Sequence, residues 1–101
     1  MKISKEELAR IAACFTILSH TRGRLRARVD PKITQKVEGL RIEHIEEIPE
    51  RIEGIEKIRL NPLNGSVTIH YDHRKLPKDL WEDLVNGENI EACLERIRMN
   101  G

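Results

Sequence analysis

Aromatic residues are scarce in this 101-residue chain, which contains one Phe, one Tyr and one Trp. Long apolar runs are also missing, since no segment approaches the roughly 20 consecutive apolar residues that a membrane-spanning helix needs. The N-terminus carries Glu6 and Glu7 and lacks the apolar stretch and cleavage site of a signal peptide. We therefore expect a soluble protein with no membrane span, located in the cytoplasm.

An excess of charge of one sign is lacking as well, because 18 Lys and Arg residues offset 17 Asp and Glu residues. With a net charge of only +1, any binding of an anion must come from local clustering of cations. Hydrophobic residues make up 39% of the chain and charged residues 35%, which excludes disordered and membrane-embedded classes. The length of 101 residues predicts a single domain, 1–101.

Cysteine is limited to Cys14 and Cys93, which form no CxxC or other close pair. We interpret them as two buried thiols, since free cysteine is among the residue types found most often in protein cores. The chain also lacks the GxSxG, P-loop, HExxH and GxGxxG motifs of common enzyme classes. These absences favour a binding protein over an enzyme.

The first apolar pattern predicts a helix over residues 5–17. Ser4 and Glu7 have the spacing of a capping box, in which each side chain bonds to the other residue's backbone N–H group. Four apolar residues then recur at helical intervals and give the helix one buried side: Leu8, Ile11, Ala12 and Phe15.

The segment from His20 to Asp30 alternates between two kinds of residue, which predicts one continuous strand. Small and aliphatic residues form one side, which we expect to face the core. The other side is a row of four arginines, and His20 shares their parity: Arg22, Arg24, Arg26 and Arg28. Because like charges on one strand face repel each other, this row needs a partner.

The remaining patterns predict helices and a hairpin. Residues 33–53 form an acidic amphipathic helix kinked at Pro49, or two helices. Turn-forming residues separate two alternating segments, 55–60 and 66–72, which we expect to form a β-hairpin. Helices over 77–86 and about 89–99 complete the chain.

The resulting order, α-β-α-β-β-α-α, belongs to the α+β class. Without its first helix it contains a βαββα core over about residues 18–86, the first five elements of the ferredoxin-like fold. In that topology the first core strand lies beside the third, and its other edge is free because the usual fourth strand is missing. A free edge needs cover, which residues 14–20, the terminal helices or a second chain could supply. We expect a homodimer.

Two stretches of the sequence resemble a divergent branch of the heavy-metal-associated (HMA-like) domain family: H-T-R-G-R-L-R over residues 20–26, and I-E-G-I-E-K-I-R-L-N-P-L-N-G-S-V-T-I-H-Y-D over residues 52–72. The resemblance implies a ferredoxin-like fold and an association with metal handling. Members of that family occur as small free-standing proteins and in heavy-metal-transporting P-type ATPases. The family's usual CxxC metal motif is absent, since residues 30–34 contain no cysteine.

Three histidines are candidates for a metal or haem site, because imidazole is a suitable ligand for zinc, iron and nickel. His20 and His70 would lie together on the exposed sheet face if the first and third core strands are neighbours. His73 follows directly after the third core strand. The alternative is that these histidines are solvated and hold no metal.

The candidates for binding an anion or an acidic partner are His20, Arg22, Arg24, Arg26, Arg28 and Arg59. Guanidinium groups pair with carboxylates and phosphates, and His20 is expected on the same face. The alternative is a solvated face neutralised by the Glu-rich helix of this chain or of a neighbour.

We interpret the chain as a non-enzymatic binding module of metal or haem homeostasis and transport. It would be an accessory or regulatory partner of an acidic protein or of a metal-transporting ATPase. Two hypotheses from other classes are a self-assembling interaction protein and a nucleic-acid-binding protein. The lack of an outward aromatic residue for base stacking argues against RNA.

Overall fold

The computed structural model describes residues 4–100, apart from the side chain of Ile42. Helices and strands both contribute, which confirms the α+β class. In chain order the elements are α1 (Lys5–Ala13), β1 (Phe15–Thr21), β2 (Arg24–Val29), α2 (Ile33–Lys36), α3 (Ile42–Glu46), α4 (Ile48–Arg51), β3 (Ile55–Asn61), β4 (Ser66–Tyr71), α5 (Lys78–Asn86) and α6 (Ile90–Arg96).

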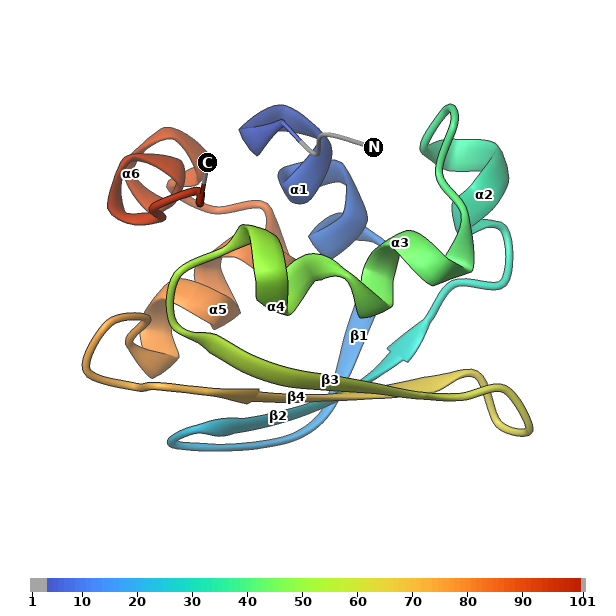
Figure 1. Ribbon diagram of the computed structural model, residues 1–101, viewed down its shortest axis with the longest axis horizontal. Helices are drawn as coiled ribbons and strands as arrows, with labels where there is room; N and C mark the ends of the chain where they lie inside the picture. Colours follow the sequence, from blue (N-terminus) through green and yellow to red (C-terminus); the bar gives the residue numbers. More distant parts are fainter. Residues whose placement is uncertain (1–3, 101) are drawn as a thin grey trace.

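The four strands form one antiparallel sheet in the order β1-β2-β4-β3. The helices lie on one face of this sheet, so that the molecule has a helical layer and a sheet layer (Figure 1). Within the helical layer, α3 and α4 pack against β3, α5 packs against β1, and α1 packs against α5 and α6. The other face of the sheet is left without cover by any described element.

The helix expected over residues 5–17 is wrong in its last part, because residues 15–17 belong to strand β1. Helix α1 begins as predicted, with the Ser4 hydroxyl accepting a hydrogen bond from the backbone N–H of Glu7 at 3.1 Å. The helix nevertheless ends at Ala13, and the following residues, rich in β-branched and aromatic side chains, adopt the extended conformation that suits them. The prediction extended the helix too far because Phe15 fits both the helical stripe and an inward position in a strand.

The single strand expected over residues 20–30 is also wrong, because a turn at Arg22 and Gly23 divides it between β1 and β2. Gly23 has φ +89°, and a Cβ atom there would lie 3.3 Å from the carbonyl oxygen of Tyr71. Both the backbone angle and the close approach of β4 therefore require glycine at this turn. His20 and Arg22 consequently lie outside the arginine row.

The edge of β2 that was expected to be free is paired with β1. On its other side β2 pairs with β4, which confirms that the first and third strands of the expected core are neighbours. Because the edge is paired within the chain, the reason for expecting a homodimer is removed. The homodimer itself stays a prediction.

The acidic segment over residues 33–53 forms three short helices, not the one or two that were expected. Gly39, with φ +78°, lies in the break between α2 and α3. Pro49 lies in the first turn of α4, where its missing N–H group is not needed. The last helix, α6, is also shorter than the expected 89–99.

The core lies between the sheet and the helical layer. Side chains of β2 and β4 on this side are almost completely buried, and so are those of Leu80, Trp81 and Leu84 on α5. Cys14 and Cys93 are buried free thiols, as predicted. Across the part of the chain that the structure describes, no helix is both long and apolar enough to span a membrane.

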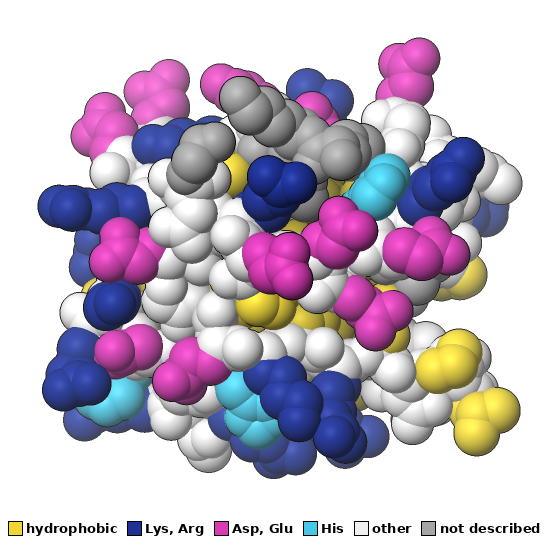
Figure 2. All heavy atoms as spheres, viewed as in Figure 1, with side chains coloured by type: hydrophobic (Ala, Val, Ile, Leu, Met, Phe, Trp, Pro, Cys, Tyr) yellow, Lys and Arg dark blue, Asp and Glu magenta, His cyan; other side chains and the backbone are white. Residues whose placement is uncertain are grey.

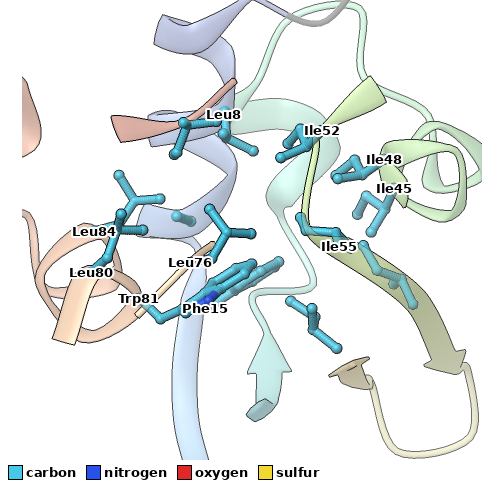
Figure 3. Close-up of a pocket in the computed structure, with 14 residues that line it drawn as sticks. Leu8, Phe15, Ile45, Ile48, Ile52, Ile55, Leu76, Leu80, Trp81 and Leu84 are labelled. Atoms are coloured by element: carbon cyan, nitrogen blue, oxygen red, sulfur yellow. The ribbon is translucent and has the colours of Figure 1, made fainter. Parts of the chain in front are cut away.

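A small cavity remains inside this core (Figure 3). It measures about 30 Å³ and is lined by apolar side chains, among them Phe15, Ile55, Leu76 and Trp81. Pockets that hold small molecules usually measure about 300–1,000 Å³. We therefore interpret this cavity as a gap in packing and not as a ligand pocket.

Candidate functional site

The uncovered face of the sheet presents three rows of side chains that run across the strands. The register gives the rows as Thr21, Arg24, His70 and Lys57; then Ser19, Arg26, Thr68 and Arg59; then Thr16, Arg28, Ser66 and Asn61. We call this surface the basic sheet face, after its five cations: Arg24, Arg26, Arg28, Lys57 and Arg59. In Figure 2, Lys and Arg side chains gather along the lower edge of the molecule, where Figure 1 places the sheet.

The alternation of β2 and of the hairpin places these cations outward. Each arginine of β2 is exposed, while the intervening Leu25, Ala27 and Val29 are buried. Lys57 and Arg59 are exposed on β3, two positions apart on the same side of the alternating segment 55–60. Arg59 is thus joined with three of the four arginines expected in the row, and Lys57 extends the surface.

Within residues 4–100, none of the five cations lies within 4.0 Å of a carboxylate oxygen. The described strands contain a single carboxylate, that of Glu56, which lies at a β-bulge in the edge strand β3. The Glu-rich segment is part of the helical layer on the other side of the sheet. Neutralisation of the arginines by the chain's own Glu-rich helix, one of the two alternatives above, is therefore wrong.

The unpaired arginines repel one another. Neighbouring arginines on β2 are two positions apart, so their Cα atoms are about 6.7 Å apart along the strand, and we take this spacing as the order of magnitude of the distance between their charges. At this distance two unit charges in water repel each other by roughly 0.6 kcal/mol. The face therefore carries a positive potential that an anionic partner would relieve.

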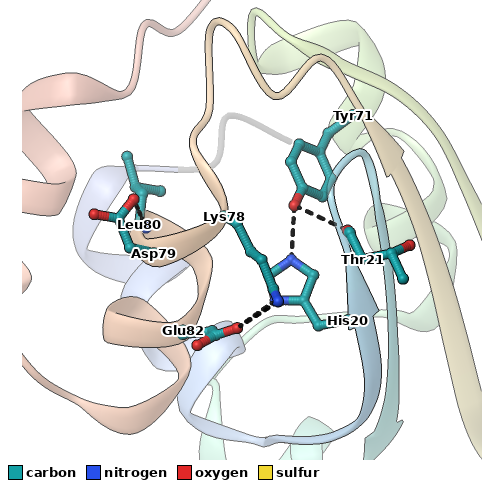
Figure 4. A network of polar contacts seen from close by, with 7 residues as sticks. All are labelled: His20, Thr21, Tyr71, Lys78, Asp79, Leu80 and Glu82. Atoms are coloured by element: carbon teal, nitrogen blue, oxygen red, sulfur yellow. Dashed lines mark hydrogen bonds and ion pairs between the residues drawn. The ribbon is translucent and has the colours of Figure 1, made fainter.

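His20 does not belong to the basic sheet face. In the strand pairing it lies opposite Leu25, and its side chain is only 3% exposed. Its Nδ1 lies 3.0 Å from a carboxylate oxygen of Glu82 on α5, and its Nε2 lies 2.6 Å from the hydroxyl of Tyr71 (Figure 4). The histidine thereby links β1 to α5 and β4.

The partners of His20 identify its hydrogen-bond pattern. A carboxylate can only accept, so Nδ1 donates its proton to Glu82 and, in the neutral ring, Nε2 accepts from the Tyr71 hydroxyl. Burial lowers the pKa of His20 below its ordinary value, although the hydrogen bond to Glu82 acts in the opposite direction. Burial likewise raises the pKa of Tyr71. The network therefore consists of a neutral imidazole and a neutral phenol at neutral pH.

The proposed histidine ligands are not brought together. His70 lies on the basic sheet face, between Arg24 and Lys57 in its row, whereas His20 lies on the opposite face of the sheet. The expectation that both point to the exposed face is therefore wrong. Among the described residues, no group of three or more His, Cys, Asp or Glu side chains is arranged to hold a metal ion.

His73 and Arg22 line a different region, an open polar cleft of about 440 Å³ beside the start of α5. Lys78, Asp79 and Glu82 contribute to the same cleft. Arg22 lies in the turn between β1 and β2 and lines this cleft, so it is not part of the rows of the basic sheet face.

Sequence reasoning missed two features of these sites. One is the contact of His20 with Tyr71 and Glu82, which are 51 and 62 residues away in the chain. The other is a β-bulge at Leu18, which reverses the parity of β1 and turns His20 inward. Neither feature has a local sequence signal, because both depend on which strand and helix pack beside β1.

No family model matches the chain, and the searches of curated proteins and of solved structures found no significant match. The similarity to the heavy-metal-associated family therefore stays a resemblance that rests on the motifs of residues 20–26 and 52–72.

Proposed function

We propose that the chain is a non-enzymatic binding module and that its basic sheet face binds an anionic partner. The observation that carries this proposal is the group of five exposed, unpaired cations on a sheet face that no described helix covers. Guanidinium groups bind carboxylates and phosphates through parallel hydrogen bonds, and an uncovered sheet leaves room for a large partner.

The absence of catalysis is part of the same proposal. The arrangement most like an acid–base relay is the chain of contacts from Glu82 through His20 to Tyr71. The Tyr71 residue is only 2% exposed, so a substrate has no access to its hydroxyl, and burial raises its pKa. This supports a structural role for the network, as a clamp between β1 and α5.

The ferredoxin-like assignment is also a proposal, supported by the position of β2 beside β4 and by a βαββα order from β2 to α5. In this interpretation β1 occupies the sheet position that the fourth strand of that fold would take. Together with the resemblance to the heavy-metal-associated family, this supports an accessory or regulatory role in metal or haem homeostasis. Within that role, the acidic surface of a metal-transporting ATPase is one candidate for the anionic partner.

The binding proposal can be tested by nuclear magnetic resonance. The labelled protein is titrated with heparin, a dense polyanion, at low salt. Amide signals of β2, β3 and β4 should shift, and those of α3 and α4 should not. An Arg26→Gln variant should shift less than a matched Arg10→Gln variant, which loses an exposed arginine of α1. Shifts centred on the helical layer, or no shifts at all, would refute the proposal.

The link to metals needs a separate experiment. Protein purified without a histidine tag is examined by elemental analysis and absorption spectroscopy, alone and after addition of zinc, copper, iron or haem. Because His20 and His70 lie on opposite faces, we expect a His20→Asn/His70→Asn variant to match the parent chain. Stoichiometric metal or haem that is lost in this variant would show that the two histidines form a ligand site after all.

A further inference from the structure

We propose that the basic sheet face binds the phosphate backbone of a nucleic-acid duplex without reading its sequence. This inference rests on the proposed function, because it names the partner of the same face.

The cations form two lines whose separation suits a double helix. Arg24, Arg26 and Arg28 follow β2, while Lys57 and Arg59 follow β3, and β4 lies between the two strands. Two strand spacings separate these lines by about 9.6 Å. The two phosphate chains of a duplex flank grooves of about 6 Å and about 12 Å in width. Flexible Arg and Lys side chains on two such lines can therefore reach both phosphate chains.

The other side chains of this face are also of the type that binds phosphates. Between and beside the cations lie hydroxyl groups and one imidazole, contributed by Thr16, Ser19, Thr21, Thr68 and His70. Arg, Lys, Ser and Thr are among the side chains that contact the nucleic-acid backbone. None of the twelve residues in the three rows is acidic, and the one carboxylate of the described strands, that of the exposed Glu56, lies at the bulge of the edge strand β3 beside Lys57.

A protein partner fits this face less well. Stable protein interfaces have an apolar centre with depleted charge. The three rows contain no aliphatic side chain, and Leu18, 45% exposed at the bulge of the edge strand β1, is a single apolar residue beside them. Exposed ion pairs contribute little individually and do not offset the freedom that two proteins lose on association. A duplex supplies an additional driving force, because its condensed counterions are released when cations replace them.

A single strand also fits less well than a duplex. Proteins that hold single strands stack bases on aromatic side chains, and Tyr71 is buried on the other face of the sheet. A single strand also offers one line of phosphates to the two lines of cations. The face is therefore expected to bind the outside of a duplex.

The test uses the full chain and a fluorescently labelled DNA duplex of arbitrary sequence, about 24 base pairs long, in an anisotropy titration. If all five cations contact phosphates, the logarithm of the affinity should fall with the logarithm of salt concentration with a slope of about −4.5. This slope corresponds to a loss of about 500-fold in affinity between 50 and 200 mM NaCl. Duplexes of different sequence should bind equally.

Two variants with the same change of charge show where the duplex binds. Removal of one phosphate contact by Arg26→Gln should change the slope to about −3.6 and weaken binding about 15-fold at 50 mM NaCl. Arg10→Gln, on the helical layer, should leave the slope of the parent chain unchanged. Both arginines are exposed and unpaired among the described residues, so neither variant removes a buried contact.

The remaining outcomes separate the two proposals. Poly-L-glutamate, a probe for acidic proteins, and a single-stranded oligonucleotide are titrated in parallel. Binding of poly-L-glutamate to the sheet face without binding of the duplex would overturn this inference and leave the proposed function intact. Tighter binding of the single strand, or a duplex slope that Arg26→Gln does not change, would also overturn it. Association of the chain with itself in place of duplex binding would favour a second copy as the partner.

Discussion

Replacement of Arg26 by glutamine is expected to stabilise the protein. Arg26 lies at the centre of the arginine row, with Arg24 and Arg28 two residues away on either side of it. Glutamine keeps most of the length and the hydrogen-bonding groups of the side chain but removes its charge. The substitution therefore tests whether repulsion within the row destabilises the folded state.

The magnitude follows from the spacing of the strand. Two neighbours at about 6.7 Å each repel Arg26 by roughly 0.6 kcal/mol, which gives a total of about 1 kcal/mol in water at low salt. At an ionic strength of 0.15 M the Debye length is about 8 Å, so screening should reduce the total to about 0.5 kcal/mol. For a domain of this size, 1 kcal/mol corresponds to an increase in melting temperature of about 4–8 °C.

The assay is urea unfolding followed by circular dichroism at about 10 mM and about 150 mM salt. The free energy of unfolding of Arg26→Gln should exceed that of the parent chain, and the gain should shrink by about half at the higher salt. Arg10→Gln is the matched control, and it should give no gain because Arg10 lies in the last turn of α1, where a cation is favourable. A loss of stability in Arg26→Gln, or a gain that does not depend on salt, would refute the reasoning.

Three further results are expected. Burial lowers the pKa of His20 below its unfolded value of about 6.5, so the unfolded state binds the proton more readily than the folded state. The folded protein should therefore lose stability as the pH falls from about 6.5 toward the folded pKa, by at most about 1.4 kcal/mol per pH unit. Urea unfolding between pH 7.5 and 5 should show this loss, and a His20→Asn variant that keeps it would contradict the assignment. Trp81→Phe should lower the free energy of unfolding by less than about 1.5 kcal/mol. The lost packing is partly offset because the substitution removes a buried indole N–H that has no hydrogen-bond partner among the described atoms. A loss of about 3–5 kcal/mol in thermal unfolding would contradict this expectation. Burial raises the pKa of both Cys14 and Cys93, so a thiol reagent should label them slowly in the native protein, and rapid labelling without unfolding would be inconsistent with the structure.

Mutual repulsion within a row of exposed cations is the arrangement expected of a surface that binds an anion. Five exposed ion pairs with a protein partner would contribute about 1–5 kcal/mol in total, while association costs about 4–15 kcal/mol. Charge pairs alone are therefore a weak way to hold a second protein against this largely polar face. Relief of the repulsion within the row, together with release of counterions, makes a polyanion the more favourable partner.

The parts of the fold that depend on local pattern could be predicted from the sequence. The hairpin of β3 and β4 has turn-forming residues between two alternating segments, and the buried side of α5 has helical spacing. The outward cations of β2 and β3 follow from the same two-residue alternation. These features depend on residues close together in the chain, so the sequence contains the information needed to place them.

The errors lie where a distant partner decides the conformation. Phe15 continues the apolar spacing of α1, yet residues 15–17 pair with residues 27–29 because the edge of β2 offers unsatisfied backbone groups. The turn at Gly23 was hidden because the residues on both sides of it keep the alternating pattern. Pairing with a distant strand thus overrode the local preference, and the predicted positions of His20 and Arg22 were wrong for the same reason.

The bulge at Leu18 determines what the two faces of β1 contain. Before the bulge Phe15 and Ile17 point inward, and after it His20 does, although an unbroken alternation from Phe15 would turn His20 outward. The extra residue therefore lets one short strand bury two apolar side chains and also direct an imidazole toward Glu82. As a consequence, β1 contributes Thr16, Ser19 and Thr21 to the outward rows, and Leu18 at the bulge is left 45% exposed beside them. The His20 clamp on the helical side of the sheet and the outward placement of the hydroxyl residues of β1 thus depend on the same irregularity of this strand.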